Sequence, residues 1–136
     1  MLGTPEKYKK NYQRLTQLAS SYPEIVRIIP SVPYQQLGTM IRAADCVIIP
    51  SLSEGFGYNA LEANVIGTPV VASDVGSLPE VASGKYLFFK SKNPEDMAEK
   101  IKAVAKGEWK YLPLKKFTWD ACVESYLKVY SQILKQ

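Results

Sequence analysis

Short apolar runs alternate with longer amphipathic segments along this chain, and that alternation constrains its fold more than any other feature. The runs that read as buried β-strands are 26–29, 46–49, 70–72 and 86–89. Apolar residues recur at helical spacing over 5–21, 34–44, 58–66, 94–106 and 118–134, with an irregular stretch at 109–113. Strands that alternate with helices through short links predict an α/β fold, with a Rossmann-like open parallel sheet of about four strands flanked by helices.

Individual residues mark the ends of several of these elements. Pro5 suits the first turn of a helix, and Pro30 ends the first strand because it cannot donate to a ladder. Gly67 fits the left-handed C-cap of the helix 58–66. Because no linker, repeat or low-complexity segment interrupts the pattern, we expect residues 1–136 to form a single domain.

The composition excludes several classes of site. The chain contains no histidine, which excludes Ser-His-Asp and Cys-His catalysis and argues against a zinc site. The two cysteines, Cys46 and Cys122, cannot build a disulfide framework, so we expect a cytoplasmic protein. No apolar run reaches the roughly 18 residues of a membrane span. We expect no metal and no cofactor, so that any chemistry uses carboxylates, backbone amides, hydroxyls and lysines.

The net charge is +4 and comes mainly from lysines scattered singly and in pairs. Such lysines are usually solvated on helix faces; the alternative is attraction to anionic partners such as nucleotide phosphates or acidic lipids. The chain has no arginine–aromatic stripe and no nucleic-acid-binding motif, so we expect no nucleic-acid partner.

The segment 51–63 leaves a predicted buried strand and enters a helix, which places it where open parallel sheets bind ligands. Gly55 and Gly57 allow backbone conformations closed to other residues and let a ligand approach the main chain. The amides that follow, at Gly57, Tyr58 and Asn59, are unpaired donors of a helix N-terminus and suit a diphosphate. A plain glycine-rich turn is the alternative.

Glu62 is the unusual residue of the helix 58–66. On a helical wheel it falls within an apolar arc with Tyr58, Leu61, Val65 and Ile66. A buried carboxylate without a partner costs several kcal/mol, so we expect a protein donor or a ligand hydroxyl beside it. The alternative is a rotated helix that brings Glu62 to the solvent-exposed rim.

Glu54 and Glu62 form the pattern E-x7-E around the glycine loop. Together with its surroundings this pattern resembles the retaining GT-B glycosyltransferases of the glycogen-synthase-like group, family 4. The matching segments are AAD at 43–45, IPS at 49–51, EGFG at 54–57, LEA at 61–63, GTPVVAS at 67–73, LPE at 78–80 and FTW at 117–119. They occur in order over 26–130, which is far more specific than any single motif.

The resemblance implies a nucleotide-sugar site in the C-terminal half of a two-domain hexosyltransferase, acting with retention and without a metal. It implies that Glu54, the catalytic candidate, holds hydroxyls of the donor sugar and that Glu62 accepts from the ribose hydroxyls. The other residues that it assigns to substrate binding are Gly55, Phe56, Gly57, Tyr58, Asn59, Leu61, Ser31 and Val32. Of these, Ser31 and Val32 stand in the loop that contacts the base, where the family usually has a glycine.

The family's C-terminal domain begins with two further strands and a basic pair that contacts the phosphates. This chain opens at 1–3 with what looks like the tail of the second strand. We therefore expect an incomplete GT-B C-terminal domain, with the N-terminal acceptor domain also absent and supplied by a longer protein or a partner chain. The isolated chain is then expected to be weak or inactive. In a 3-2-1-4-5-6 sheet the absent strands are the middle ones, so the strands 26–29 and 46–49 either close up or leave a gap.

Two other functions fit the same residues. The segment 55–60 matches G-x-G-x-x-A and Asp74 ends a later strand, which is the outline of an NAD-binding fold. Against it, residues 51–54 separate the strand from the glycine turn. A non-catalytic nucleotide-binding or assembly module with a degenerate site is the stronger alternative. Aromatic residues such as Trp109, Trp119 and Tyr126 are its candidate partner surface, although such residues more often pack in a core. The lysine excess is also compatible with an acceptor at a membrane surface.

Overall fold

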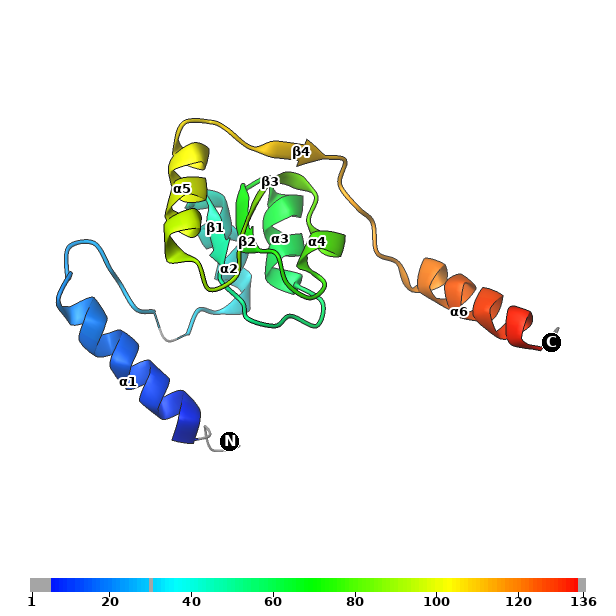
Figure 1. The fold of residues 1–136 in the computed structure, drawn as a ribbon, viewed down its shortest axis with the longest axis horizontal. Helices are drawn as coiled ribbons and strands as arrows, with labels where there is room; N and C mark the ends of the chain where they lie inside the picture. The colour runs from blue at the N-terminus through cyan, green and yellow to red at the C-terminus, as the bar shows by residue number, and fades with distance from the viewer. Residues whose placement is uncertain (1–5, 30, 135–136) are drawn as a thin grey trace. The chain divides into compact units, whose positions relative to one another are not determined.

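The computed structural model describes residues 6–29 and 31–134, and the chain divides into two compact units, Met1–Gln36 and Leu37–Gln136. Each is described by itself. In the first unit, helix α1 spans Glu6–Ser20, which confirms the predicted helix (Figure 1). Pro5, expected in its first turn, lies outside the described residues. Two α1 residues on the predicted apolar stripe, Leu15 and Leu18, are exposed.

The strand predicted at 26–29 does not form, so that prediction is wrong. The N–H groups of Ile25 and Val26 donate to the Tyr22 carbonyl at 3.0 and 2.8 Å, closing a turn. A strand persists only where a neighbour completes its ladder, and no strand of the described chain pairs with this segment. An apolar composition alone is therefore not enough to make residues 26–29 a strand. Pro30, expected to end the strand, lies outside the described residues.

The second unit is built on a four-stranded sheet in the order β1-β2-β3-β4 (Figure 1). The strands are β1 (Val47–Ile49), β2 (Val70–Ser73), β3 (Gly84–Phe89) and β4 (Lys110–Leu112). The first three are parallel, which confirms the predicted α/β class and the open sheet. β4 pairs antiparallel with β3 and corrects the expectation of an irregular stretch at 109–113. A strand of three exposed residues carries too little periodicity to be recognised.

The helices largely follow their sequence signals. They are α2 (Tyr34–Ala43), α3 (Tyr58–Ile66), α4 (Leu78–Val81), α5 (Pro94–Ala105) and α6 (Trp119–Ile133). The bounds of α3 are those predicted, and Gly67 is its left-handed cap with φ 91°. Thr118 caps α6 by accepting from the Ala121 N–H at 3.2 Å. The single turn α4 was not predicted.

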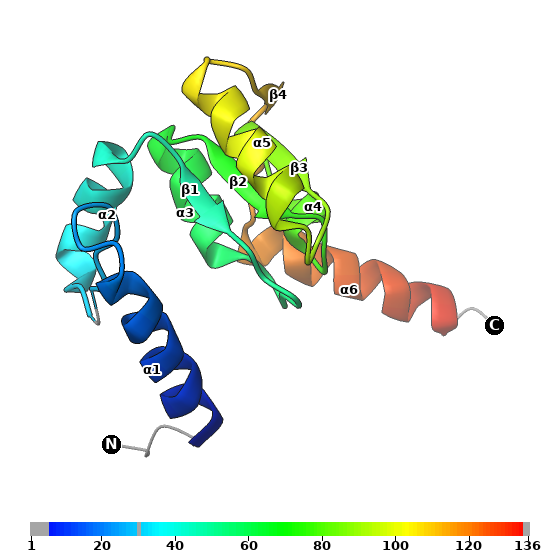
Figure 2. The same ribbon diagram turned by 60° about the vertical axis from the view of Figure 1, so that its left-hand side comes forward.

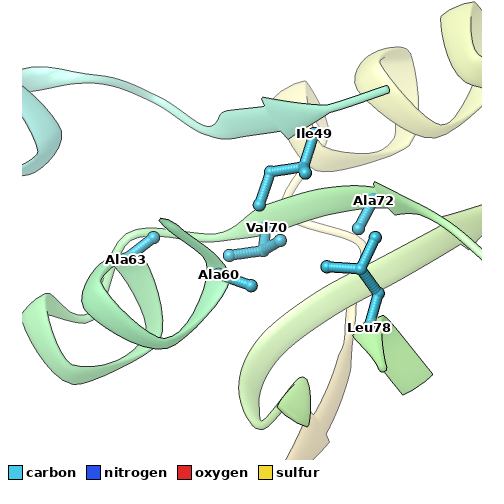
Figure 3. Close-up of a cluster of buried hydrophobic side chains, with 6 residues drawn as sticks. All are labelled: Ile49, Ala60, Ala63, Val70, Ala72 and Leu78. Carbon is cyan, nitrogen blue, oxygen red and sulfur yellow. The ribbon is translucent and has the colours of Figure 1, made fainter. Parts of the chain in front are cut away.

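Helices α3 and α5 cover opposite faces of the sheet (Figures 1 and 2). The cluster under α3 joins strand residues to two alanines and one residue of α4 (Figure 3): Ile49, Val70, Ala72, Ala60, Ala63 and Leu78. The cluster under α5 is centred on Val71, Phe89 and Val104. Residues of β2 thus contribute to both cores, as expected for a parallel strand covered on two sides.

The face that α3 buries is Ala60, Ala63 and Asn64, which corrects the helical-wheel expectation. Tyr58 and Val65, expected inside, are 69% and 64% exposed. Side-chain size decides the outcome, because only small residues let the helix axis approach the sheet this closely. Asn64 adds a polar anchor, since its Oδ1 accepts from the N–H of the buried Ser83 at 2.9 Å.

None of the helices formed by the described residues combines the length and the hydrophobicity needed to cross a membrane.

Lys92 is the one described non-glycine residue with a left-handed backbone, at φ 61°. This conformation costs a side-chain-bearing residue about 1–2 kcal/mol. We expect Lys92→Gly to raise the free energy of unfolding by about 1 kcal/mol, measured by thermal or urea unfolding. The control is Lys90→Gly, which has no such strain to relieve and should lower stability. Equal effects of the two changes would contradict this.

Asp96 fastens the start of α5. Its pKa is lowered, chiefly because its carboxylate accepts from the Lys90 N–H at 2.7 Å, and also because Lys100 lies 3.1 Å away. A lowered native pKa stabilises the fold above the ordinary Asp value, near 4, and this contribution is lost as pH falls through the native value. We expect Asp96→Asn to lower the unfolding midpoint at pH 7, with the gap to the wild type closing below about pH 4. Lys100→Met, which spares the backbone bond, should have a smaller effect.

Candidate functional site

The loops that follow β1 and β2 meet at the carboxyl edge of the sheet. Ser73, at the end of β2, donates from Oγ to the Ser51 carbonyl at 2.7 Å. Further along, the Glu54 carbonyl accepts from the backbone N–H of Ser77 at 3.3 Å and from its Oγ at 3.4 Å. The second loop therefore holds the first at two places.

Gly76 makes the second of these attachments possible. Its φ is +56°, and a Cβ built on it would stand 2.3 Å from the carbonyl oxygen of Glu54. Neither the backbone conformation nor the space tolerates a side chain. The sequence prediction did not single out Gly76, although a glycine between a strand and an L-P-E turn is the signal that could have found it.

The two glycines of the first loop differ. Gly57 is left-handed at φ +96°, and an added Cβ would lie 3.1 Å from Leu78 Cδ2. Gly55 has no positive φ, and an added Cβ meets no atom within 4 Å. The expectation of a special backbone is therefore confirmed for Gly57 and wrong for Gly55. Gly55 is distinguished by the open space beside it and not by a strained backbone.

Helix α3 begins directly after Gly57 with its first amides free. The Gly57 carbonyl accepts from the N–H groups of Ala60 and Leu61 at 3.0 and 3.1 Å, and no side chain caps the helix. The N–H groups of Tyr58 and Asn59 donate to no acceptor in the described chain. No acidic residue stands in the first turn, so the acidic side chain next to this positive end of the helix is Glu54 of the preceding loop, whose Cγ lies 3.7 Å from a Cβ built on Gly57.

Glu54 and Glu62 flank this helix end from the loop and from the helix. Glu54 is half-buried, and its Oε2 accepts from the Ser51 Oγ at 3.1 Å. Glu62 is also half-buried, and it lines a cavity together with residues of α2 and β1. It makes no hydrogen bond or ion pair with any residue whose structure is described. Its carboxylate is thus available to a ligand, although at a rim and not inside the core as the wheel suggested.

Two cavities lie beside α3, and five of the predicted substrate-binding residues line one or the other. The smaller, about 360 Å³, is lined by Glu62 and Asn59 together with residues of β1 and α2. The larger, about 580 Å³, is lined by Phe56, Tyr58 and Leu61 together with the residues that open α6. The ring of Phe56 lies 4.7 Å from that of Tyr58 and 5.3 Å from that of Phe117, centroid to centroid.

The remaining predicted residues fall elsewhere. Ser31 and Val32 belong to the first unit, and their assignment to a base stays a prediction. Asp74, the candidate ribose ligand of an NAD-binding fold, accepts from the Ser91 N–H at 3.0 Å and so fastens the loop after β3. Over the described ranges, no group of three or more His, Cys, Asp or Glu side chains is placed to hold a metal ion.

Comparison with known proteins places these features in a family. Residues 2–117 match the family described as Glycosyl transferases group 1. A D-inositol 3-phosphate glycosyltransferase from Corynebacterium jeikeium is 36% identical over 79% of this chain, and an uncharacterized glycosyltransferase from Methanocaldococcus jannaschii is 29% identical over 98%. The matched regions are 28% and 40% of those two proteins, so this chain spans less than half of either.

A solved structure shows the same fold. Sucrose-phosphate synthase from Thermosynechococcus elongatus superposes with a TM-score of 0.64 at 22% identity, over 93% of this chain and 35% of that one. The predicted Rossmann-like architecture is thereby confirmed, and the predicted relation to GT-B glycosyltransferases agrees with the family match.

The close approach at Gly76 gives a direct test of the loop geometry. We expect Gly76→Ala to push the loop away from the Glu54 carbonyl and to lower the free energy of unfolding by about 1–3 kcal/mol. Gly55→Ala is the matched control, since its Cβ enters open space and should change stability little. Urea unfolding of both variants checks this. Equal losses would show that the Gly76 contact is not what holds the loop.

Proposed function

Because this chain belongs to the Glycosyl transferases group 1 family, we propose that it is the donor-binding part of a glycosyltransferase that uses a nucleoside diphosphate sugar. One arrangement carries the proposal: the free amides at the start of α3 stand at the carboxyl edge of a parallel sheet, with the half-buried Glu54 in the loop before them and the half-buried Glu62 one turn along the helix.

The diphosphate is assigned to the N-terminus of α3. The unpaired N–H groups of Tyr58 and Asn59 supply donors, and the helix dipole supplies positive charge without a metal. As the bond from the sugar to the phosphate breaks, negative charge grows on the departing diphosphate. Fixed donors aimed at that charge stabilise the transition state more than the ground state.

The sugar is assigned to the loop 54–57. The Glu54 carboxylate, already held by Ser51, would accept from two neighbouring hydroxyls of the hexose and orient its anomeric carbon. The open space at Gly55 lets a sugar approach the backbone, which explains why a glycine stands there although the protein itself would tolerate a Cβ. Phe56 and Gly57 are the other two residues of the loop that would line the sugar. Glu54 is on this account the catalytic residue.

The nucleoside is assigned to the smaller cavity. Glu62 would accept from the ribose hydroxyls, with Asn59 beside it. Ser31 and Val32 are proposed to contact the base. Leu61 faces the larger cavity and is proposed as an apolar contact with substrate.

The remainder of the proposal follows the family resemblance. We propose transfer with retention of anomeric configuration, with no metal and no cofactor. Both the acceptor site and a basic pair for the phosphates are proposed to lie in polypeptide beyond this chain, since the relatives are more than twice as long. In this view residues 1–136 are a partial GT-B C-terminal domain in the cytoplasm, inactive or weakly active alone, and the acceptor is either soluble or at a membrane surface.

The strongest rival is a nucleotide-binding or assembly module that performs no transfer. The exposed apolar side chains of α6, among them Trp119, Tyr126 and Ile133, favour a partner surface of this kind. An NAD-binding function is weaker, because residues 51–54 separate β1 from the glycine turn and Asp74 Oδ1 already holds the loop after β3 through the Ser91 N–H.

Titration of the chain with UDP, GDP, ADP and NAD tests the proposal. We expect one nucleoside diphosphate to bind, and Glu62→Gln to weaken it by about tenfold to a hundredfold, the cost of losing a charge-assisted hydrogen bond. Addition of EDTA should not change the Kd. Preferential NAD binding that Asp74→Ala abolishes would indicate the rival fold, and no binding of any nucleotide would contradict the donor site.

The same titration separates the two carboxylates. Glu54→Gln and Gly55→Ala should weaken the matching sugar nucleotide more than the bare diphosphate, because both residues are assigned to the sugar. Glu62→Gln should weaken both ligands alike. If Glu54→Gln weakens the sugar nucleotide and the bare diphosphate equally, Glu54 does not contact the sugar.

A further inference from the structure

Ser51 stands at the start of the loop that leads from β1 to the glycines, two residues after the end of the strand. Its side chain is half-buried, and its hydroxyl donates to Oε2 of Glu54 at 3.1 Å. Ser51 also lines the smaller cavity, beside Asn59 and Glu62. Its hydroxyl therefore contacts the carboxylate assigned to the sugar, although Ser51 itself is assigned to no part of the donor.

The backbone of Ser51 is held in place by Ser73. This serine ends β2, is 1% exposed, and donates from Oγ to the Ser51 carbonyl at 2.7 Å. A buried hydroxyl keeps such a bond because breaking it would leave a polar group unpaired in the core. The sheet thus sets the position of Ser51, whereas Leu52 and Ser53, the next two residues of the loop, are exposed.

Glu54 is consequently held at both its backbone and its side chain. Its carbonyl accepts from the Ser77 N–H at 3.3 Å, and its carboxylate accepts from the Ser51 hydroxyl. The last torsion of a glutamate side chain has a broad energy minimum, so a carboxylate without a partner turns readily. A donor on Oε2 limits that rotation, and it leaves Oε1 and the second lone pair of Oε2 for ligand hydroxyls.

We propose that Ser51 is a positioning residue that sets how strictly the site selects its donor sugar, a role that rests on the proposed donor site and deepens it. Ser51 holds the Glu54 carboxylate in the orientation that accepts from two neighbouring hydroxyls of a hexose. A carboxylate in a fixed orientation disfavours an epimer that leaves one of its oxygens unpaired. A carboxylate that turns freely would accept both epimers with more similar affinity.

A purely structural role of Ser51 is the alternative. Ser51 and Glu54 are three positions apart, so their hydrogen bond also closes a turn of the loop. If the bond served only this purpose, loss of the hydroxyl would lower stability and would weaken all ligands by the same factor. If Ser51 acts on selectivity, the sugar nucleotide should lose more affinity than the bare diphosphate, because only the sugar contacts Glu54.

Calorimetric titration of the whole 136-residue chain distinguishes the two roles. The probes are UDP, GDP and ADP, and the glucose, galactose and mannose conjugates of the diphosphate that binds. We expect Ser51→Ala to weaken the preferred sugar nucleotide about tenfold and the bare diphosphate less than about twofold. The preference for that sugar over its epimers should fall in the same variant. Ser51→Thr keeps the hydroxyl and should bind within about threefold of the wild type.

Two further variants make the test specific. Ser53→Ala is the matched control, because Ser53 is an exposed serine of the same loop whose hydroxyl bonds to no residue of the described ranges. It should leave the affinities for both ligands unchanged. The double variant Ser51→Ala/Glu54→Gln should lose no more affinity for the sugar nucleotide than Glu54→Gln alone, because Ser51 acts through that carboxylate.

A measurement without ligand completes the test. Carbon-13 relaxation of the Glu54 side chain should show more picosecond-to-nanosecond motion in Ser51→Ala than in the wild type, and no increase in Ser53→Ala. Unchanged motion in Ser51→Ala would overturn the positioning role even if no nucleotide binds.

The titrations can overturn the role of Ser51 in two ways. One is a loss in Ser51→Ala that is equal for the sugar nucleotide and the bare diphosphate. The other is a double variant whose loss is the sum of the two single losses, which would mean that Ser51 acts independently of Glu54. A wild-type chain that binds no nucleoside diphosphate would instead contradict the donor site itself, so the two failures are distinguishable.

Discussion

The close packing of α3 on the sheet is the contact on which the site depends. Ala60 and Ala63 bring the helix against Ile49, Val70 and Ala72, so that its N-terminus stands beside the loops that leave β1 and β2. Larger residues at those two positions would lift the helix and carry its free amides away from Glu54. The chemistry proposed for this edge therefore depends on small side chains at these two positions as well as on the two carboxylates.

Local signals predicted the elements whose causes are local. The bounds of α3 follow from the glycine before it and Gly67 after it, and α6 begins at its Thr118 cap. The parallel strands β1 to β3 were found from uniformly apolar runs, which burial on two faces requires. For the same reason the sequence alone predicts that the glycine loop lies at the carboxyl edge of the sheet.

The predictions that the structure corrects have nonlocal causes. The segment 26–29 has the composition of a strand but no partner among the described strands, and pairing is a property of the neighbour. The wheel for α3 ranked residues by hydrophobicity, whereas the fit to the sheet selected them by size and left Tyr58 and Val65 outside. Gly76 was missed because its importance comes from the Glu54 carbonyl, 22 positions earlier in the chain.

The bond between Asn64 and Ser83 has a mechanical consequence. Asn64 Oδ1 is paired inside an apolar layer, whereas its Nδ2 is buried there without a partner. The bond that Oδ1 accepts resists sliding or turning of the helix, because any displacement breaks it without offering water in exchange. We expect helix α3 to stay in place when a molecule binds. Any adjustment of shape must then come from the glycine loop 54–57 that precedes it. Induced fit at this edge would be a movement of main chain around a stationary helix end.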